Sequence, residues 1–121
     1  MIRVLYVDDE PDIREIALLA LSLDPGIESR GAASGPEALV IMDEWLPDMV
    51  LLDVMMPGLD GPSTLARLRG NPTTSAVPVV FITARAQSQE IHGFATLDAL
   101  GVIAKPFDPM TLAQQVRAFL A

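Results

Sequence analysis

The 121-residue chain contains no cysteine, a single lysine and few aromatic residues. Without cysteine it can form neither a disulfide framework nor a thiolate metal site. It also lacks any apolar run near the roughly 20 residues that span a bilayer. The apolar stretch after Met1 reaches the acidic residues Asp8 and Asp9 too soon for a signal peptide. We therefore expect a cytoplasmic protein that does not enter a membrane.

An excess of basic residues is absent as well. The chain has 16 acidic and 8 basic residues, which gives a formal net charge of -8 at pH 7. The arginines are scattered, and only Arg67 and Arg69 lie close together. Such a chain repels nucleic-acid phosphates and anionic lipid, so direct binding to either is disfavoured.

Half of the residues are hydrophobic, and the length suits one domain with its own core, so we expect residues 1–121 to form one domain. Short runs rich in apolar and β-branched residues predict strands. They cover residues 2–7, 27–33, 49–52, 77–82 and 101–104.

Helical patterns lie between these runs and after the last one. Pro11 suits the first turn of the first helix, and Ser34 with Glu37 has the spacing of a capping box. Asp108 and Pro109 offer an N-cap and a first-turn proline for the last helix. The patterns cover residues 12–23, 38–45, 65–70, 87–100 and 112–120.

Strands that alternate with helices predict an α/β protein, in which helices cover both faces of a parallel sheet. In such a sheet the ligand site lies at the carboxyl ends of the strands. The residues at or just beyond those ends are Asp8, Asp9, Asp53, Thr83 and Lys105.

Three carboxylates that converge on one crevice repel one another and need a proton or a cation. Oxygen ligands suit Mg²⁺, whereas zinc prefers the histidine or cysteine that this crevice lacks. With a cation bound, Asp53 could attack phosphorus while the Lys105 ammonium offsets charge on the phosphoryl oxygens. The Thr83 hydroxyl could donate a hydrogen bond to a phosphoryl oxygen, and Ala84 leaves room beside it.

Each of these residues taken alone has a more ordinary explanation. An aspartate after a strand is more often a cap or turn residue, and we assign such roles to Asp12 and Asp60. His92 is expected on the surface, and Met55 and Met56 can serve packing only. The evidence for a site is that acidic, hydroxyl and ammonium groups fall at four different strand ends.

Four segments resemble the successive signatures of response-regulator receiver domains from two-component signalling, and the resemblance spans essentially the whole chain. The segments are VLYVDDEPD, PDMVLLDVMMPGLDG, VPVVFITA and IAKPFDPMTL. The resemblance implies a flavodoxin-like (βα)5 three-layer sandwich with a five-stranded sheet of order 2-1-3-4-5, as in a chemotaxis regulator.

The resemblance also assigns roles at the site. It makes Asp53 the acceptor of a phosphoryl group from a histidine kinase or a histidine phosphotransfer protein. Asp9 would bind Mg²⁺ directly and Asp8 largely through water, and Asp53 and the backbone carbonyl of Met55 would complete the set. Lys105 would pair with the phosphoryl group. The protein would assist its own phosphorylation and its own slow dephosphorylation. It would be a signalling phosphoacceptor and not an enzyme.

Further positions carry implied roles in switching. Thr83 would move toward the phosphoryl group, Gly61 matches the glycine that follows the acceptor loop, and the bond between Lys105 and Pro106 would be cis. Val102 occupies a position where the family often has an aromatic ring that turns inward, so that readout is lost here.

Two positions tune hydrolysis in the family, and here they hold Met55 and Arg85. Met55 is expected to hinder the attacking water. Gly93 suggests that the fourth helix is easily remodelled.

By the same resemblance, a downstream protein docks on the fourth helix, fifth strand and fifth helix, and we expect the output to be another protein because the sequence ends after the fifth helix. A flavodoxin-like cofactor binder is a poor alternative because Asp8, Asp9 and Glu10 would repel a flavin phosphate. A haloacid-dehalogenase-type phosphohydrolase needs a second aspartate where Met55 stands. The remaining alternative is a receiver-like interaction module that works without phosphorylation.

Overall fold

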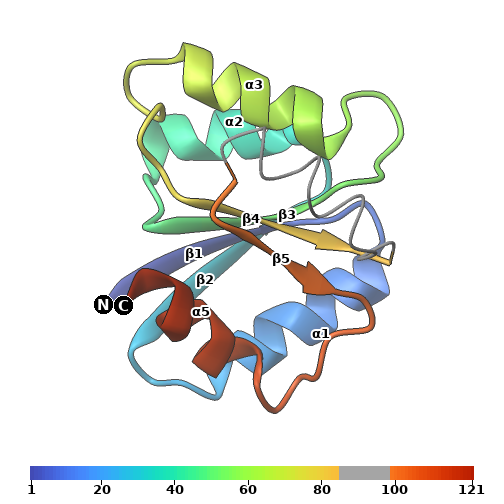
Figure 1. Cartoon of the computed structure of the whole chain (residues 1–121), viewed down its shortest axis with the longest axis vertical. Helices are drawn as coiled ribbons and strands as arrows, with labels where there is room; N and C mark the ends of the chain where they lie inside the picture. The colour runs from blue at the N-terminus through green and yellow to red at the C-terminus, as the bar shows by residue number, and fades with distance from the viewer. Residues whose placement is uncertain (85–98) are drawn as a thin grey trace.

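The computed structural model describes residues 1–84 and 99–121, and its centre is a parallel five-stranded sheet (Figure 1). The strand order β2-β1-β3-β4-β5 confirms the predicted topology. Every strand lies within two residues of its predicted bounds. The strands are β1 (Ile2–Val7), β2 (Ile27–Ala32), β3 (Met49–Asp53), β4 (Val79–Thr83) and β5 (Gly101–Ala104).

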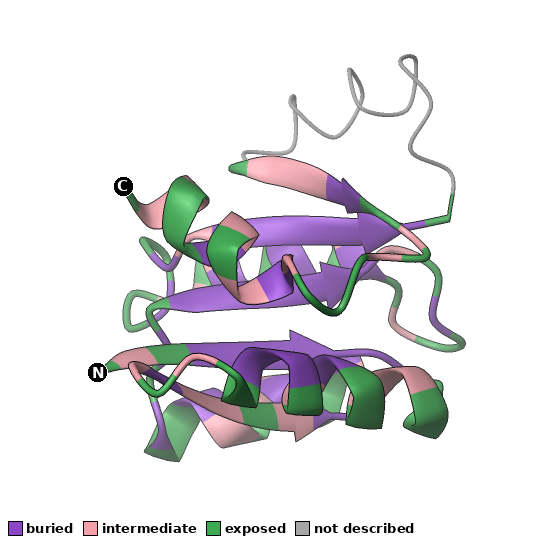
Figure 2. Ribbon diagram, turned by 90° about the horizontal axis from the view of Figure 1, so that it is seen from below, coloured by how far each residue is buried: buried purple, intermediate pink, exposed green. Residues whose placement is uncertain are grey.

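The described residues contain four helices, two on each face of the sheet, which confirms the three-layer arrangement. On one face lie α1 (Pro11–Ser22) and α5 (Leu112–Leu120), and on the other α2 (Gly35–Glu44) and α3 (Gly61–Gly70). Both chain termini lie at the end of the molecule where the strands begin (Figures 1 and 2). The helix predicted over 87–100 falls almost wholly outside the described residues, as do Arg85, His92 and Gly93.

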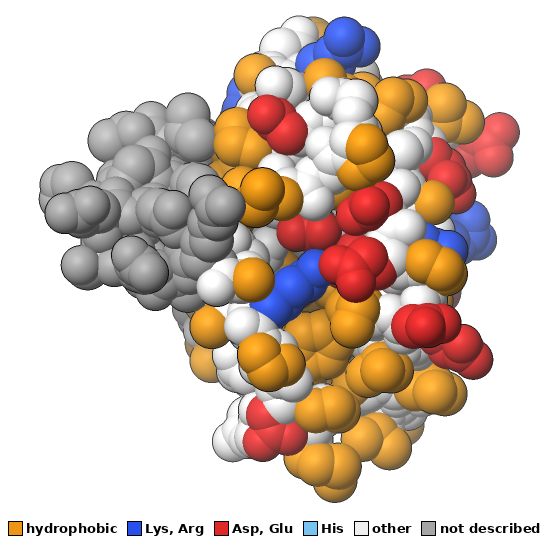
Figure 3. Space-filling view, turned by 90° about the vertical axis from the view of Figure 1, so that its right-hand side faces the viewer, with side chains coloured by type: hydrophobic (Ala, Val, Ile, Leu, Met, Phe, Trp, Pro, Cys, Tyr) orange, Lys and Arg blue, Asp and Glu red, His pale blue; other side chains and the backbone are white. Residues whose placement is uncertain are grey.

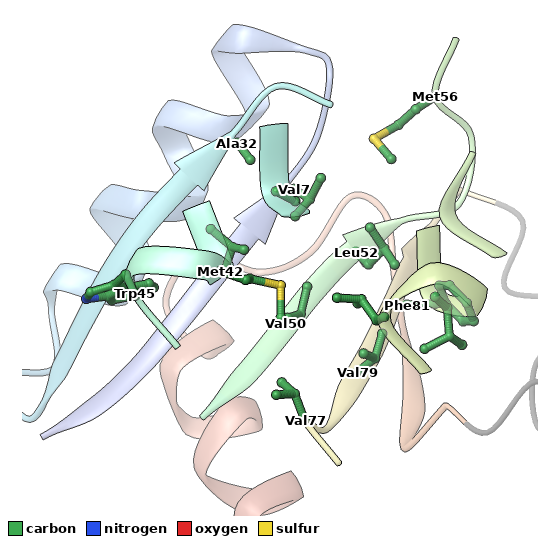
Figure 4. Close-up of a cluster of buried hydrophobic side chains, with 14 residues drawn as sticks. Val7, Ala32, Met42, Trp45, Val50, Leu52, Met56, Val77, Val79 and Phe81 are labelled. Atoms are coloured by element: carbon green, nitrogen blue, oxygen red, sulfur yellow. The ribbon is translucent and has the colours of Figure 1, made fainter. Parts of the chain in front are cut away.

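Successive side chains of the central strands enter two separate cores, because neighbours along a strand point to opposite faces. β3 and β4 are buried along their whole length (Figure 2). The core beside α2 and α3 includes Leu5, Val50, Leu52, Met42 and Phe81 (Figure 4). The core beside α1 and α5 includes Val4, Tyr6, Leu51, Ile82 and Val116.

Side-chain caps fix the starts of two helices. The Ser34 hydroxyl accepts a hydrogen bond from the Glu37 N–H at 3.2 Å, and the Glu37 carboxylate accepts one from the Ala33 N–H at 3.2 Å. Asp60 caps α3 by accepting from the Ser63 N–H at 2.8 Å. The predicted capping roles of Ser34 and Asp60 are therefore confirmed. Asp12 does not cap α1, whose N-cap position is Glu10; it lies in the first turn, where its charge suits the helix dipole.

The predicted start of one helix and the predicted N-cap of another were wrong. Helix α3 begins at Gly61, four residues before Leu65, because the Asp60 cap starts it. Helix α5 begins at Leu112 with Thr111 at the N-cap position. The Asp108 carboxylate instead accepts from the Met110 N–H at 2.9 Å and closes a turn ahead of the helix.

The only tryptophan, Trp45, is buried after α2 and has two guanidinium groups near its ring. The Cζ atoms of Arg3 and Arg30 lie 5.6 and 4.8 Å from its ring centroid, and its indole N–H donates to the Glu28 carboxylate at 3.0 Å. These contacts join the end of α2 to the edge of the sheet.

Candidate functional site

The carboxyl ends of four strands bring the predicted site residues to one edge of the sheet. Asp8 and Asp9 follow β1, Asp53 ends β3 and Thr83 ends β4, while Lys105 directly follows β5. Because β1 pairs with β3, and β4 with β5, these ends are neighbours. Acidic side chains gather around one basic side chain on this face, and hydrophobic side chains extend from it toward the α1 side (Figure 3).

Three carboxylates form a compact acidic cluster. One oxygen from each of Asp8, Asp9 and Asp53 lies within 4.8 Å of the others. Asp8 and Asp53 are buried, and Asp9 is half-buried at the rim. An all-oxygen donor set with access from one side fits a hard cation that keeps several waters, which is the preference of Mg²⁺.

Lys105 bridges two of these acids. Its Nζ lies 2.7 Å from Asp8 Oδ2 and 3.3 Å from Asp53 Oδ2. Burial acts to lower the pKa of Lys105, but the hydrogen bond with Asp8 and the charge of Asp53 outweigh it, so the pKa is raised. The lysine therefore stays positively charged beside the acidic cluster.

The surroundings of Asp53 disfavour its ionised form. Burial raises the pKa of its carboxyl to about 6, the Lys105 ammonium opposes that rise, and the Asp8 charge adds to it. The Met55 N–H donates to Asp53 Oδ1 at 3.3 Å. The ionised form is thus poorly compensated, which favours whatever brings further positive charge to the site.

Asp8 is held by contacts that sequence reasoning missed. The Tyr6 hydroxyl donates to Asp8 Oδ2 at 3.0 Å, the Glu10 N–H donates to Asp8 Oδ1 at 3.0 Å, and Arg14 donates to the Asp8 carbonyl oxygen at 2.8 Å. Burial, with the charge of Asp8 next, raises the pKa of Tyr6. The signal was present in the strand period of two, which puts Tyr6 and Asp8 on one face.

Gly61 allows the acceptor loop, residues 54–60, to return against the backbone of Asp53 and Val54. A β-carbon at Gly61 would collide with the Asp53 carbonyl oxygen and with Val54 Cα. The Gly61 N–H donates to the Val54 carbonyl at 3.0 Å. Gly58 in the same loop has a φ of 77°, a conformation that glycine adopts without strain.

The remaining predicted residues also lie around the cluster. Thr83 is buried, Ala84 beside it is exposed, and the bond between Lys105 and Pro106 is cis as expected. Val102 is half-buried and packs against the core beside α2 and α3. Met55 is 58% exposed at the mouth of the site.

A parallel sheet of this order, with an acidic cluster and a lysine at its carboxyl edge, defines the class of α/β phosphoacceptor signalling domains. The family model for the response regulator receiver domain matches residues 4–117, so the chain belongs to the receiver family of two-component signalling. Receiver domains generally bind Mg²⁺ at an acidic pocket, and response regulators partner with histidine kinases or phosphotransfer proteins.

Individual relatives agree with the family assignment. The response regulator Rre1 of Synechocystis sp. is 39% identical over 99% of this chain and 52% of its own length. The response regulator PleD of Caulobacter vibrioides is 40% identical over 96% of this chain and 25% of its own length. The chain therefore spans about half or less of these relatives.

Solved structures show the same fold over nearly the whole chain. The chemotaxis protein CheY4 of Vibrio cholerae has a TM-score of 0.90 at 29% identity, with 98% of each chain covered. A putative response regulator from Chloroflexus aurantiacus has a TM-score of 0.87 at 36% identity, with 98% of this chain and 96% of that chain covered.

Proposed function

We propose that Asp53 accepts a phosphoryl group from a phosphohistidine of a histidine kinase or phosphotransfer protein, and that residues 1–121 act as one receiver unit. The observation that carries the proposal is the arrangement of Asp53 between an ammonium 3.3 Å away and two further carboxylates. A carboxylate with a pKa of about 6 is mostly ionised at pH 7 and is available as a nucleophile.

The residues would divide the work of the transfer. A carboxylate oxygen of Asp53 bonds to phosphorus while the P–N bond of the donor breaks and its electron pair returns to the imidazole nitrogen. Asp8, Asp9, Asp53 and the Met55 carbonyl would hold Mg²⁺, which when bound offsets negative charge on the phosphoryl oxygens. Lys105 supplies the positive charge from the opposite side.

The donor would approach over the rim of the site next to Lys105. A groove of about 450 Å³ lies there, lined by Ile13, Ile16, Ala84, Lys105 and Phe107 among others. Its walls are mainly apolar, and it opens beside the acidic cluster (Figure 3). A partner that presents a phosphohistidine to Asp53 can rest on this apolar surface.

Phosphorylation would then switch a protein-binding surface. The added charge would draw Lys105 and the Thr83 hydroxyl toward the phosphoryl group and shift β5 and α5. Val102 is too small for an aromatic readout, so the Thr83 movement would carry the signal. The downstream target is a protein that docks on this surface.

Met55 would slow the loss of the phosphoryl group. Met55 is 58% exposed, and its backbone N–H donates to Asp53 Oδ1, so its apolar side chain would hinder water that approaches Asp53. Rapid decay of the label in the wild-type protein would count against this role.

We also assign the protein to the cytoplasm. The response-regulator family acts in signal transduction, and no helix in residues 1–84 and 99–121 is long and apolar enough to cross a membrane.

Labelling with a small phosphodonor tests the proposal directly. With acetyl phosphate and Mg²⁺, intact mass is expected to show one phosphoryl adduct in the wild-type protein and none in Asp53→Asn. Asp9→Asn should need far more Mg²⁺, whereas Asp43→Asn, an exposed acid on α2, should label like the wild type. Wild-type protein that binds a kinase but never takes the label would instead favour an interaction module that works without phosphorylation.

A further inference from the structure

We propose that the Tyr6 hydroxyl is a positioning group for phosphoryl transfer: it holds Asp8 in place and frees Lys105 to move from Asp8 to the phosphoryl group on Asp53. This inference rests on the proposed function. It concerns a buried tyrosine of β1 to which the sequence reasoning gave no role.

Tyr6 and Lys105 donate to the same oxygen. The Tyr6 hydroxyl lies 3.0 Å and the Lys105 Nζ 2.7 Å from Asp8 Oδ2, and the Glu10 N–H occupies Oδ1 at 3.0 Å. Both Asp8 and Tyr6 are wholly buried. The Asp8 carboxylate is therefore held from both of its oxygens without relying on the lysine alone.

Before phosphorylation the lysine lies closer to Asp8 than to Asp53, at 2.7 against 3.3 Å. When Lys105 turns to the phosphoryl group, Asp8 loses a donor inside the protein, and a buried carboxylate without donors is costly. Tyr6 remains on that oxygen and lowers the cost of the move. With phenylalanine in its place, Lys105 is held more firmly by Asp8 and is less available to Asp53.

The tyrosine cannot turn its hydroxyl to solvent. Its backbone pairs with Gly31 of β2 and Leu51 of β3. Its ring packs edge-on against Phe107, with ring centroids 6.2 Å apart and planes at 70°. Since Phe107 follows the Lys105–Pro106 bond, the segment that carries the lysine also rests on this ring.

The test compares Tyr6→Phe with the wild type in acetyl phosphate labelling at saturating Mg²⁺. We expect the labelling rate to fall roughly tenfold, which corresponds to about 1.4 kcal/mol. In a Lys105→Ala background the same substitution should change the residual rate little, because the lysine through which Tyr6 acts is gone. An equal factor in both backgrounds would mean a merely structural role and would overturn the proposal.

Thr74→Val is the matched control for losing a buried hydroxyl. Thr74 is buried and donates to the Leu68 carbonyl at 2.7 Å, away from the acidic cluster. This variant should lose stability in urea unfolding yet label at the wild-type rate. A slowdown equal to that of Tyr6→Phe would overturn the proposal by tracing the effect to stability.

A measurement on the wild-type protein covers the case in which Tyr6→Phe does not fold. Because Tyr6 is the only tyrosine, ¹³C labelling of tyrosine gives one set of ring signals. Addition of Mg²⁺ and beryllofluoride, a phosphoryl mimic, should shift the ring carbon that bears the hydroxyl, and should shift it less in Lys105→Ala. An unchanged signal in protein that has bound beryllofluoride would overturn the proposal. Wild-type protein that neither labels nor binds beryllofluoride would instead refute the proposed function.

Discussion

At the residue scale, the negative charge of Asp53 lowers the free energy of unfolding. Its folded-state pKa of about 6 lies above its ordinary value of 3.8, so the folded protein binds more protons than the unfolded chain between these two pH values. The free energy of unfolding therefore falls as pH rises through this window, and the penalty is fully present above it. Positive charge added near Asp53 would reduce this destabilisation.

Asp53→Asn is accordingly expected to stabilise the metal-free protein at pH 7 by roughly 1–3 kcal/mol, since one pKa unit corresponds to about 1.36 kcal/mol. The gain should shrink to near zero by pH 4, where the wild-type carboxyl is also neutral. Urea unfolding followed by circular dichroism at several pH values measures it, with Asp43→Asn as the control for losing one charge. A gain that stays constant from pH 4 to pH 7 would contradict the assigned pKa.

The main site residues could be predicted because they are polar or charged side chains at the ends of strands. The sequence pattern locates those strand ends well. Asp8, Asp53 and Lys105 needed only the rule that parallel strands end at one edge. Tyr6 escaped because a tyrosine within an apolar strand is ordinarily a core residue. The pairing of β1 with its neighbouring strands fixes the direction of the ring and so brings the hydroxyl to Asp8.

At the element scale, the two glycines of α3 have opposite environments. A β-carbon at Gly61 meets the backbone of Asp53 and Val54, while one at Gly70 meets nothing within 4 Å. The start of the helix is thus packed onto the acceptor strand, and its end is open.

Gly61→Ala is expected to destabilise the protein by roughly 1–3 kcal/mol, because the acceptor loop must shift to make room. Labelling of Asp53 should slow as well. Gly70→Ala is the matched control and should stabilise by roughly 0.5–1 kcal/mol through the lower entropy of the unfolded chain. Urea unfolding and acetyl phosphate labelling measure both effects, and equal behaviour of the two variants would show that the contact at Gly61 does not constrain the loop.

Strand bounds were predictable to within two residues because apolar, β-branched runs are bounded by proline, glycine or acid. Helix starts were less so. Asp60 and Asp108 both precede a proline closely, yet Asp60 caps α3 and Asp108 closes a turn. The path of the chain after each aspartate depends on how the next residues pack on the core. A local sequence pattern does not contain that information.

At the scale of the whole molecule, the net charge of -8 makes the protein responsive to divalent cations. Binding of Mg²⁺ to the folded state alone stabilises by about 2.7 kcal/mol at 100 times its dissociation constant. We expect the melting temperature to rise by several degrees in Mg²⁺. The fluorescence of buried Trp45 and circular dichroism can both follow the melting.

Asp9→Asn should lose most of this rise, and sodium chloride at matched ionic strength should reproduce little of it. A rise of the same size in sodium chloride would mean that general screening, and not a site at Asp8, Asp9 and Asp53, accounts for the effect.

Both termini lie at the end of the molecule opposite the carboxyl edge of the sheet (Figures 1 and 2). A tag placed at either end can therefore anchor the protein to a sensor chip with Asp53 directed away from the support. Association and dissociation of a candidate kinase can then be timed on the immobilised protein with little steric interference from the surface.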